Sequence, residues 1–496
     1  MKKILYGSLL LSILQSILFW YKSPGISVIL FTIPTILVIL YNLKEQKMLK
    51  NKKGILWSIP IILLSLTYFI FNNLFFQLLN VPVIFALIIL MCISITEEKI
   101  SENRFIRNII SKAFKPLAVL FEFIGDFEID GFLGKQKEEQ NEKIKTIKKV
   151  GKSLLIAIPI ILIIILLLSS ADSIFGSLFS SISEFISRAF ESETISDIIK
   201  RVIIIILSFV YIVGFIITFI KKDDTENEKK ETRKLNLNTL TSNMILTSLN
   251  IIYLIFSIIQ FRYLFMNAGK TPDFDYATYA RTGFFQLMFV SFINLALLKI
   301  TKETKEKLIQ ILKILLIIFT MIIVISAMFR MHLYEQEYGY TYLRLFVYFI
   351  LATEILILMP ILMNNFGQKF DTFSISLKII ICMYIILNFI NIDYIIARNN
   401  IDRYLANPEK NRLDAFYISN CTGTDAINEK LKLLNASSDG LSYDRKEYMN
   451  NVKQTIKNEL LSYKNRYARQ EFNWQEWNLS KMKAYNLLKN INIQNK

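Results

Sequence analysis

Arginine and tyrosine recur together at several positions in the second half of this 496-residue chain. Arginine carries a planar, permanently charged fork that binds carboxylate or phosphate through paired hydrogen bonds, and a neighbouring tyrosine can stack on it. A carboxylate close by, Asp393, can balance part of the charge. Together these residue types predict an anion-binding site. Its candidate residues are Arg262, Arg281, Arg330, Arg344, Arg398, Asp393, Tyr279 and Tyr334.

Glu354 is a second candidate, because it lies near the middle of an apolar run at 343–363. An ionised carboxylate at the centre of a membrane helix costs about 3 kcal/mol or more unless it is paired. Two interpretations stay open. The carboxyl either couples to a proton or cation as part of a function, or it is protonated and hydrogen-bonded to Asn250, Asn294 or Ser291 on a neighbouring helix.

Membrane-spanning helices are the elements that must position these residues. The chain is 53% apolar, with 38 phenylalanines and a mean hydropathy of +0.40, and its apolar runs approach the ~20 residues that cross a bilayer core. Backbone groups cannot stay unpaired in lipid, so each span is expected to be an α-helix. The predicted fold class is therefore all-α, a polytopic integral membrane protein of about 11 spans. The spans are 4–20, 26–42, 55–72, 79–96, 153–170, 201–220, 243–262, 283–300, 309–329, 343–363 and 375–396.

Positive charge alternates between successive loops of the chain. The formal net charge of +17 is concentrated on every second loop, whereas the loops between, such as 73–78 and 171–199, are neutral or acidic. This alternation is the positive-inside pattern. It predicts a multipass protein of the cell membrane, with its N-terminus in the cytoplasm and its C-terminal tail outside. The lipid bilayer is the expected partner, and nucleic acid is not.

Composition divides the chain into six segments. They are 1–96 with four spans, 97–152 as a basic cytoplasmic interfacial segment, 153–220 with two spans and an outer amphipathic helix, 221–238 as a charged cytoplasmic linker, 239–396 with five spans, and 397–496 as a helical tail outside the membrane. In the second segment Phe105, Ile106, Ile110 and Phe114 repeat at helical spacing, which predicts a helix lying on an anionic leaflet. A solvated connector is the alternative.

The tail is expected to form a small helical domain. Tyr448, Val452, Ile456 and Leu460 keep helical spacing within 443–468. Consecutive helices joined by short loops tend to be neighbours. We therefore expect the outer ends of the last five spans, with their arginines, to meet beneath the tail.

The chain offers little material for metal or cofactor chemistry. Cys92 and Cys382 lie inside predicted spans, Cys421 is alone in the tail, and His332 is the single histidine. Neither a disulfide framework nor a zinc site is expected. Phosphate-loop, zinc-protease and hydrolase motifs are absent from the sequence. No cofactor and no catalytic set is predicted.

The same arginines carry a resemblance to a known family. The strings are Arg262-Tyr263-Leu264-Phe265, Tyr279-x-Arg281-x-Gly283-Phe284-Phe285, Arg330-Met331 with Tyr334, Gly339-x-Thr341-x-x-Arg344, Ala397-Arg398-x-Asn400-x-x-Arg403, and in the tail Asp425-Ala426 and Trp477-Asn478-Leu479-Ser480. Together they resemble bacterial multipass proteins grouped as domain of unknown function 4173, with its relative 4153, over about 150–490. Lys481 departs from the pattern, because relatives often have arginine there. The resemblance implies a polytopic membrane fold and brings no established activity.

Two classes of function remain. The favoured one is a non-enzymatic membrane protein, either transporter-like, lipid- or anion-binding, or a sensory or envelope scaffold, which uses the outer arginines to hold an anionic lipid, a lipid-linked phosphate or an envelope protein. The alternative is a membrane enzyme acting on a lipid-linked, phosphate-bearing substrate, with Asp393 or Asp172 as general base. A third interpretation needs no site, because arginine and tyrosine also anchor helices at the membrane interface.

Overall fold

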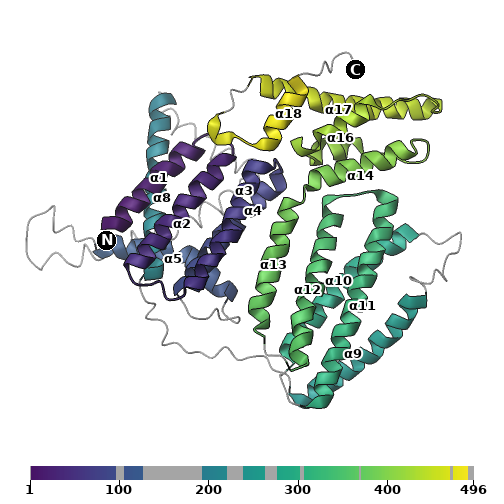
Figure 1. Ribbon diagram of the computed structural model, residues 1–496, viewed down its shortest axis with the longest axis horizontal. Coiled ribbons are helices and arrows are strands. Elements are labelled where there is room, and N and C mark those ends of the chain that lie inside the picture. Colours follow the sequence, from purple (N-terminus) through teal and green to yellow (C-terminus); the bar gives the residue numbers. More distant parts are fainter. Residues whose placement is uncertain are drawn as a thin grey trace, which may run out of the picture. The chain divides into compact units, whose positions relative to one another are not determined.

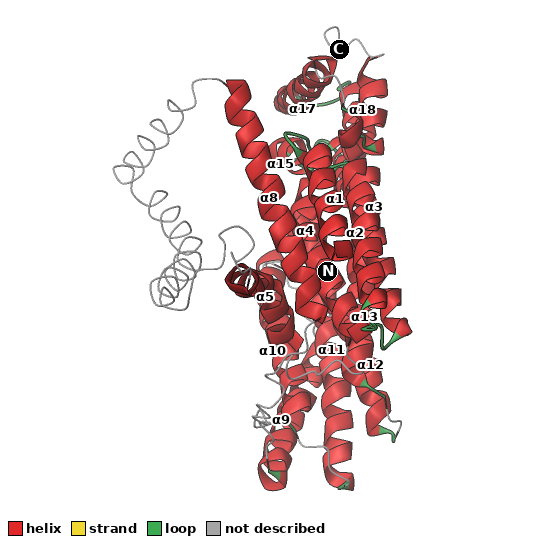
Figure 2. Ribbon diagram, turned by 90° about the vertical axis from the view of Figure 1, so that its left-hand side faces the viewer, coloured by secondary structure: helices red, strands yellow, loops and turns green. Residues whose placement is uncertain are grey.

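Helices make up the regular structure of the described part of this chain. The computed structural model describes residues 2–96, 105–126, 193–220, 238–262, 276–301, 306–367, 370–469 and 473–489. Within these ranges there are sixteen α-helices and no β-strand. Figure 1 and Figure 2 show how the helices are arranged along the chain. The predicted all-α fold class is confirmed.

Ten helices in the described ranges are long and apolar enough to cross a membrane. They are α1 (Lys2–Phe19), α2 (Ile26–Glu45), α3 (Ser58–Ile70, preceded by the 3-10 helix η1, Lys52–Trp57), α4 (Leu74–Thr96), α8 (Glu193–Ile220), α9 (Thr239–Gln260), α10 (Tyr276–Ile300), α11 (Lys307–Tyr338), α12 (Tyr342–Asn365) and α13 (Thr372–Phe389). The chain is thus a multipass membrane protein. The remaining predicted span, 153–170, the surface helix after it and most of the linker 221–238 lie outside the described residues.

One predicted span ends earlier than expected. The apolar run at 375–396 is divided into α13, which ends at Phe389, and α14 (Ile392–Ala406). The side chain of Asn391 accepts a hydrogen bond from the Tyr394 N–H at 3.1 Å and so caps the new helix. Asp393 therefore lies in the first turn of α14 rather than at the end of a span.

The described chain divides into two compact units. The first is formed by Met1–Ser23, Leu30–Ser58 and Phe85–Asp224, and the second by Pro24–Ile29, Ile59–Ile84 and Thr225–Lys496. In the first unit α8 packs against α1 and against α5 (Phe105–Asp126).

The α5 helix presents an apolar stripe to its surroundings. Ile106, Ile110 and Phe114 are mostly exposed, while Tyr211 of α8 donates a hydrogen bond to the Ala113 carbonyl at 3.0 Å. The predicted helix in this segment is confirmed. Its contact with an anionic leaflet stays a prediction.

The second unit contains a helical bundle with its own apolar core. Helices α9, α10 and α12 all pack against α11, the longest of them, and α12 also packs against α13. Figure 1 shows these five helices running side by side. Leu316, Val324 and Leu351 are among the fully buried side chains between them. This bundle positions most of the candidate residues.

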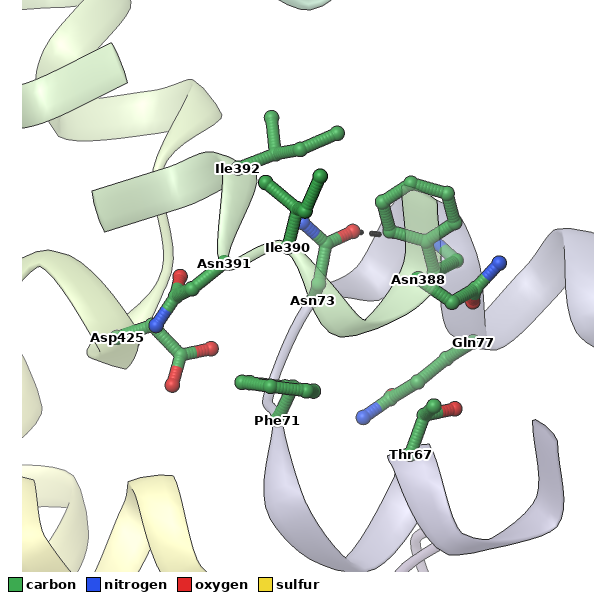
Figure 3. Close-up of a pocket in the computed structure, with 10 residues that line it drawn as sticks. Thr67, Phe71, Asn73, Gln77, Asn388, Ile390, Asn391, Ile392 and Asp425 are labelled. Carbon is green, nitrogen blue, oxygen red and sulfur yellow. Dashed lines mark hydrogen bonds between the residues drawn. The ribbon is translucent and has the colours of Figure 1, made fainter. Parts of the chain in front are cut away.

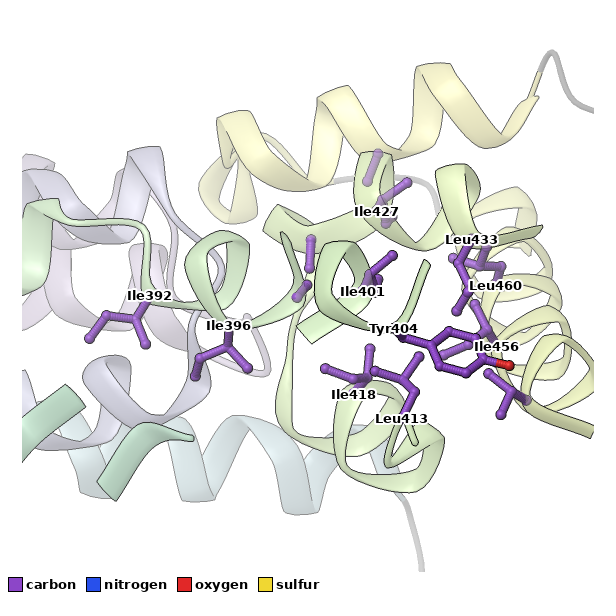
Figure 4. Close-up of a cluster of buried hydrophobic side chains, with 14 of the residues drawn as sticks. Ile392, Ile396, Ile401, Tyr404, Leu413, Ile418, Ile427, Leu433, Ile456 and Leu460 are labelled. Carbon is purple, nitrogen blue, oxygen red and sulfur yellow. The ribbon is translucent and has the colours of Figure 1, made fainter. Parts of the chain in front are cut away.

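The tail folds into short helices around a separate core. It consists of α14, α15 (Ala415–Cys421), the 3-10 helix η7 (Thr424–Ala426), α16 (Ile427–Asn435), α17 (Tyr443–Arg469), the 3-10 helix η8 (Trp474–Glu476) and α18 (Leu479–Lys489). Ile456 and Leu460 of α17 are fully buried beside Tyr404 and Leu433 (Figure 4). The helical spacing predicted within 443–468 is confirmed. Trp477 packs edge-on against Phe69 of α3, with ring centroids 5.4 Å apart.

A tight turn joins α11 to α12 and connects both to α14. Gly339 has φ +78° and ψ −175°, a conformation that is essentially limited to glycine. The Asn400 side chain of α14 makes two hydrogen bonds with Tyr340, the residue after Gly339. It accepts from the Tyr340 N–H at 2.7 Å and donates to the Tyr340 carbonyl at 2.8 Å. A side chain at position 339 would collide with the Asn400 amide.

Gly339→Ala is therefore expected to lower stability by about 1–3 kcal/mol through strain alone, and further through loss of the Asn400 bonds. Gly440→Ala is the control, because Gly440 also has φ +78° but has open space around it. Thermal unfolding of the purified protein measures both. An equal loss of stability in the two variants would show that the hydrogen bonds of Asn400 contribute nothing.

Candidate functional site

Arg330 lies inside the second unit, near the end of α11. Its side chain is only 6% exposed and donates to the Gln260 side-chain oxygen at 3.3 Å, which also accepts from Ser326 at 2.7 Å. The guanidinium rests directly on Gly283, where any side chain would overlap it. Arg330 thus ties α9, α10 and α11 together.

Arg344 is held by aromatic rings at the start of α12. Its guanidinium carbon lies 4.3 Å from the centre of the Tyr334 ring and 5.9 Å from that of Tyr338, which is cation–π geometry. It also donates to the Gly339 carbonyl. Two of the candidate residues, Arg344 and Tyr334, are thus in contact, and this contact braces the α11–α12 turn.

The two other predicted arginines with described side chains, Arg398 and Arg262, are placed separately. The Arg398 side chain is 57% exposed; it donates to the Tyr394 hydroxyl at 3.0 Å and lies 3.8 Å from Asp402. Arg262, at the end of α9, is exposed. The side chains of Tyr279 and Arg281, near the start of α10, lie outside the described part of the structure.

Asp393 is 2% exposed and both of its carboxylate oxygens accept hydrogen bonds. Asn73, in the turn between α3 and α4, donates to one oxygen at 2.8 Å, and the Gly423 N–H donates to the other at 2.7 Å. The charged groups with the largest influence on it are Asp425 and Lys430. The structure therefore joins Asp393 to the α3–α4 turn and the tail, and among the described side chains no predicted arginine bonds to it.

One peptide group is held from both sides at this point. The Gly423 N–H donates to Asp393, and the carbonyl of the same peptide group, that of Thr422, accepts from the Lys430 ammonium at 2.8 Å. Lys430 is fully buried and also pairs with Glu459 at 2.6 Å. Negative charge at the N–H and positive charge at the carbonyl both match the peptide dipole, and charge-assisted hydrogen bonds are the stronger kind.

The α3–α4 turn carries further bonds to the tail. The Asn72 N–H donates to Asp425 at 3.0 Å, and the Asn72 side chain donates to Thr424 at 3.1 Å. Gly423 lies so close to the Asn72 carbonyl that a side chain there would overlap it. We name this group, made of Asn72, Asn73, Asp393, Gly423 and Lys430 with their partners, the polar junction.

A small cavity of about 10 Å³ borders the polar junction, roughly the space of one water molecule. Figure 3 shows Asn73, Gln77, Asn388, Asn391 and Asp425 around it. A chain of amides continues from this cavity into the membrane-spanning part. Asn80 of α4 donates to Asn388 at 2.7 Å, and Tyr384 of α13 donates to Asn80 at 2.6 Å.

A second, larger cavity lies beside Glu354. It measures about 280 Å³ and is formed by α10, α12 and α13. Its lining is almost entirely apolar, with Phe292, Leu295, Phe346, Phe349, Ile350, Thr353, Glu354, Ile357, Ile380, Met383, Tyr384 and Leu387. We name it the α12 cavity. Glu354 is 2% exposed and lies 2.8 Å from the Ser291 hydroxyl, so Ser291 is its partner among the three that the sequence suggested.

The sequence analysis missed most of the polar junction. Asn73 and Asn80 are seven residues apart, about two helical turns, so they share a face. Two asparagines on one face of an apolar segment could have indicated a polar contact there. Nothing in the sequence marked Gly423 and Thr424 as part of this contact. Lys430 was not marked either, because a lysine in a polar helix is ordinarily solvated.

Burial raises the pKa of Asp393 to about 7, and the carboxylate of Asp425 adds to this effect, while the Gly423 N–H, Lys430 and Asn73 oppose it. A carboxyl whose pKa is higher in the folded state binds more protons there, so its contribution to stability falls as pH rises from about 4 to about 7. Each unit of pKa shift corresponds to about 1.4 kcal/mol.

We therefore expect the tail to unfold at a lower temperature at about pH 8 than at about pH 5. Asp393→Asn should weaken this dependence, because it removes one of the titrating groups. The matched control is Asp444→Asn, at an exposed position, and its unfolding temperature should change with pH as much as that of wild type. Tryptophan fluorescence during heating reports the transition. An unchanged slope in Asp393→Asn would contradict the assignment.

Comparison with known proteins identifies one family. The family model described as a domain of unknown function, DUF4153, matches residues 58–433. Curated proteins and solved structures give no significant match. The match begins well before the region of resemblance expected from about 150, and it ends earlier than 490. The matched region thus includes α3, α4 and the turn between them, which contain Asn72, Asn73 and Asn80. The match spans well over half of the chain, from α3 to α16, and the chain therefore belongs to the DUF4153 family of multipass membrane proteins.

Proposed function

We propose that this chain is a non-enzymatic membrane protein that binds a lipophilic molecule in the α12 cavity. The observation that carries the proposal is the cavity itself. Its volume of about 280 Å³ is close to the lower end of the range for small-molecule sites. A lining of apolar side chains with a few polar groups is also typical of such sites.

The position of the cavity supports a ligand that enters from the bilayer. The helices that form it, α10, α12 and α13, are candidate membrane spans. Phe292, Ile350 and Ile380 line the cavity and are 42%, 41% and 47% exposed. Exposed apolar side chains in a span face lipid, so the opening of the cavity lies at the depth of the lipid chains.

The arginines fit a supporting role in this proposal. Arg330 donates to Gln260 and rests on Gly283 of α10, and Arg344 donates to the Gly339 carbonyl. These contacts connect α10 and α12, two of the helices that form the cavity, to α11. Arg262 and Arg398 are exposed and would meet anionic lipid headgroups at the membrane surface.

A membrane enzyme acting on a lipid-linked phosphate is less well supported. A general base must reach the proton that it abstracts, but Asp393 is 2% exposed and both of its oxygens accept hydrogen bonds within the protein. Asp172, the other candidate base, lies outside the described residues.

The proposal includes an orientation, with the N-terminus in the cytoplasm and the tail outside, based on the alternation of loop charge. In a protein whose own cysteines are replaced by serine, Ser438→Cys in the tail should react with an impermeant thiol reagent on intact cells. Asn238→Cys, at the start of α9, should react only after permeabilisation. The reverse pattern would contradict the orientation.

Filling the α12 cavity should displace its ligand. Thr353→Phe places a ring in the cavity, because Thr353 lines it. Leu356→Phe is the matched control, since Leu356 lies on the same helix, is 42% exposed and is not part of the lining. Mass spectrometry of molecules extracted from the purified proteins should find one lipophilic compound that is retained by wild type and Leu356→Phe and nearly lost from Thr353→Phe. The same compounds in equal amounts in all three would overturn the proposal.

A further inference from the structure

The two carboxyl oxygens of Glu354 differ in their surroundings. Its Oε2 lies 2.8 Å from the Ser291 hydroxyl. Its Oε1 is fully buried and has no hydrogen-bonding partner among the described residues. An unsatisfied buried acceptor is costly. Since Glu354 lines the α12 cavity, a molecule in this cavity could supply the missing donor.

The other polar groups of the cavity wall have donors that are already engaged. The Thr353 hydroxyl donates to the Phe349 carbonyl at 2.6 Å, and the Tyr384 hydroxyl donates to Asn80 at 2.6 Å. Neither is bonded to Glu354.

Proton counting clarifies the state of Glu354. The Ser291 hydroxyl has one proton but lies within hydrogen-bonding distance of two oxygens, Glu354 Oε2 and the Met288 carbonyl at 2.7 Å. A carbonyl can only accept. Both bonds form together if Glu354 is protonated at Oε2 and donates to Ser291, which in turn donates to Met288. Oε1 is then left as a neutral acceptor on a residue that lines the cavity.

The depth of Glu354 restricts the kind of ligand. It lies about 18 Å along the axis of α12 from Tyr342, at 1.5 Å per residue, whereas the hydrocarbon core is about 30 Å thick. A phospholipid keeps its headgroup at the membrane surface. The group that meets Glu354 must instead be a small polar group that can reach the middle of the bilayer.

We propose that the α12 cavity binds an otherwise apolar molecule with a single hydrogen-bond donor, a hydroxyl or an ammonium group, and that Glu354 Oε1 accepts this hydrogen bond. This inference rests on the proposed function and names the ligand class of the same cavity.

The test uses full-length protein in nanodiscs, with Phe292→Trp as a reporter at the cavity wall. The probes are a long-chain alcohol with a bromine-bearing tail, its methyl ether, which keeps the oxygen but cannot donate, and the corresponding amine. Bromine quenches the fluorescence of the nearby tryptophan. The same protein without Trp at position 292 gives the background from the native tryptophans.

The alcohol is expected to quench at roughly tenfold lower concentration than the ether, as one hydrogen bond to a buried acceptor implies. Glu354→Gln should keep this preference, because an amide can donate to Ser291 and still present an oxygen to the cavity. Glu354→Met removes the acceptor without adding a buried polar group, so this variant should bind both the alcohol and the ether. The ratio of the alcohol and ether concentrations that quench this variant gives the baseline for comparison with wild type. The amine distinguishes the two donors: stronger quenching than the alcohol indicates ammonium, and weaker quenching indicates hydroxyl.

Two results would overturn these proposals separately. If no probe quenches Trp at position 292 above background in any variant, the cavity does not bind lipophilic molecules and the proposed function fails. If the probes quench but wild type and Glu354→Met have the same alcohol-to-ether ratio, the cavity binds and the role of Glu354 is wrong.

Discussion

The peptide group between Thr422 and Gly423 is the point on which the second unit depends. It is held by a buried carboxylate at its N–H and by a buried ammonium at its carbonyl. Burying either charge alone would cost several kcal/mol. Here each charge is bonded to the end of the peptide dipole that has the opposite sign, and each has further hydrogen-bonding partners. Removing Asp393 or Lys430 would leave the other partners of this network buried and incompletely bonded. Three separate segments, α14, α16 and the turn before η7, are fixed by one peptide.

The α3–α4 turn extends this arrangement into the membrane-spanning helices. Asn73 in this turn binds Asp393, and Asn80 of α4 binds both Asn388 and Tyr384 of α13. Tyr384 is also part of the wall of the α12 cavity. Two groups of hydrogen bonds thus connect the tail to the α3–α4 turn, and α4 to the helix that closes one side of the cavity. Membrane helices gain little from apolar contact with one another, because lipid chains are equally apolar. These polar bonds therefore do much to hold α13 beside α4.

A feature of the structure could be predicted from the sequence where it depends on residues that are close together in the chain. The spans were predictable, because a run of apolar residues of the right length has one stable conformation in lipid. The division of 375–396 was not, because Ile390, Ile392 and Ile396 continue the apolar pattern and the break depends on the Asn391 cap. Glu354 was identified because a carboxylate in an apolar run is unusual. Asp393 was identified as well, but the nearby Arg398 suggested an arginine as its partner. The structure instead gives Asp393 a hydrogen bond from Asn73, which is 320 residues away in the sequence. The volume of the α12 cavity depends on side-chain packing between three helices, which no spacing rule predicts.

The most direct test of this account is an experimental density map of the protein purified in native lipid. It should show elongated density between α10, α12 and α13 that ends within hydrogen-bonding distance of Glu354, with α13 held by the Asn80–Asn388 bond. A map in which α13 packs directly on α10, leaving no cavity beside Glu354, would contradict it.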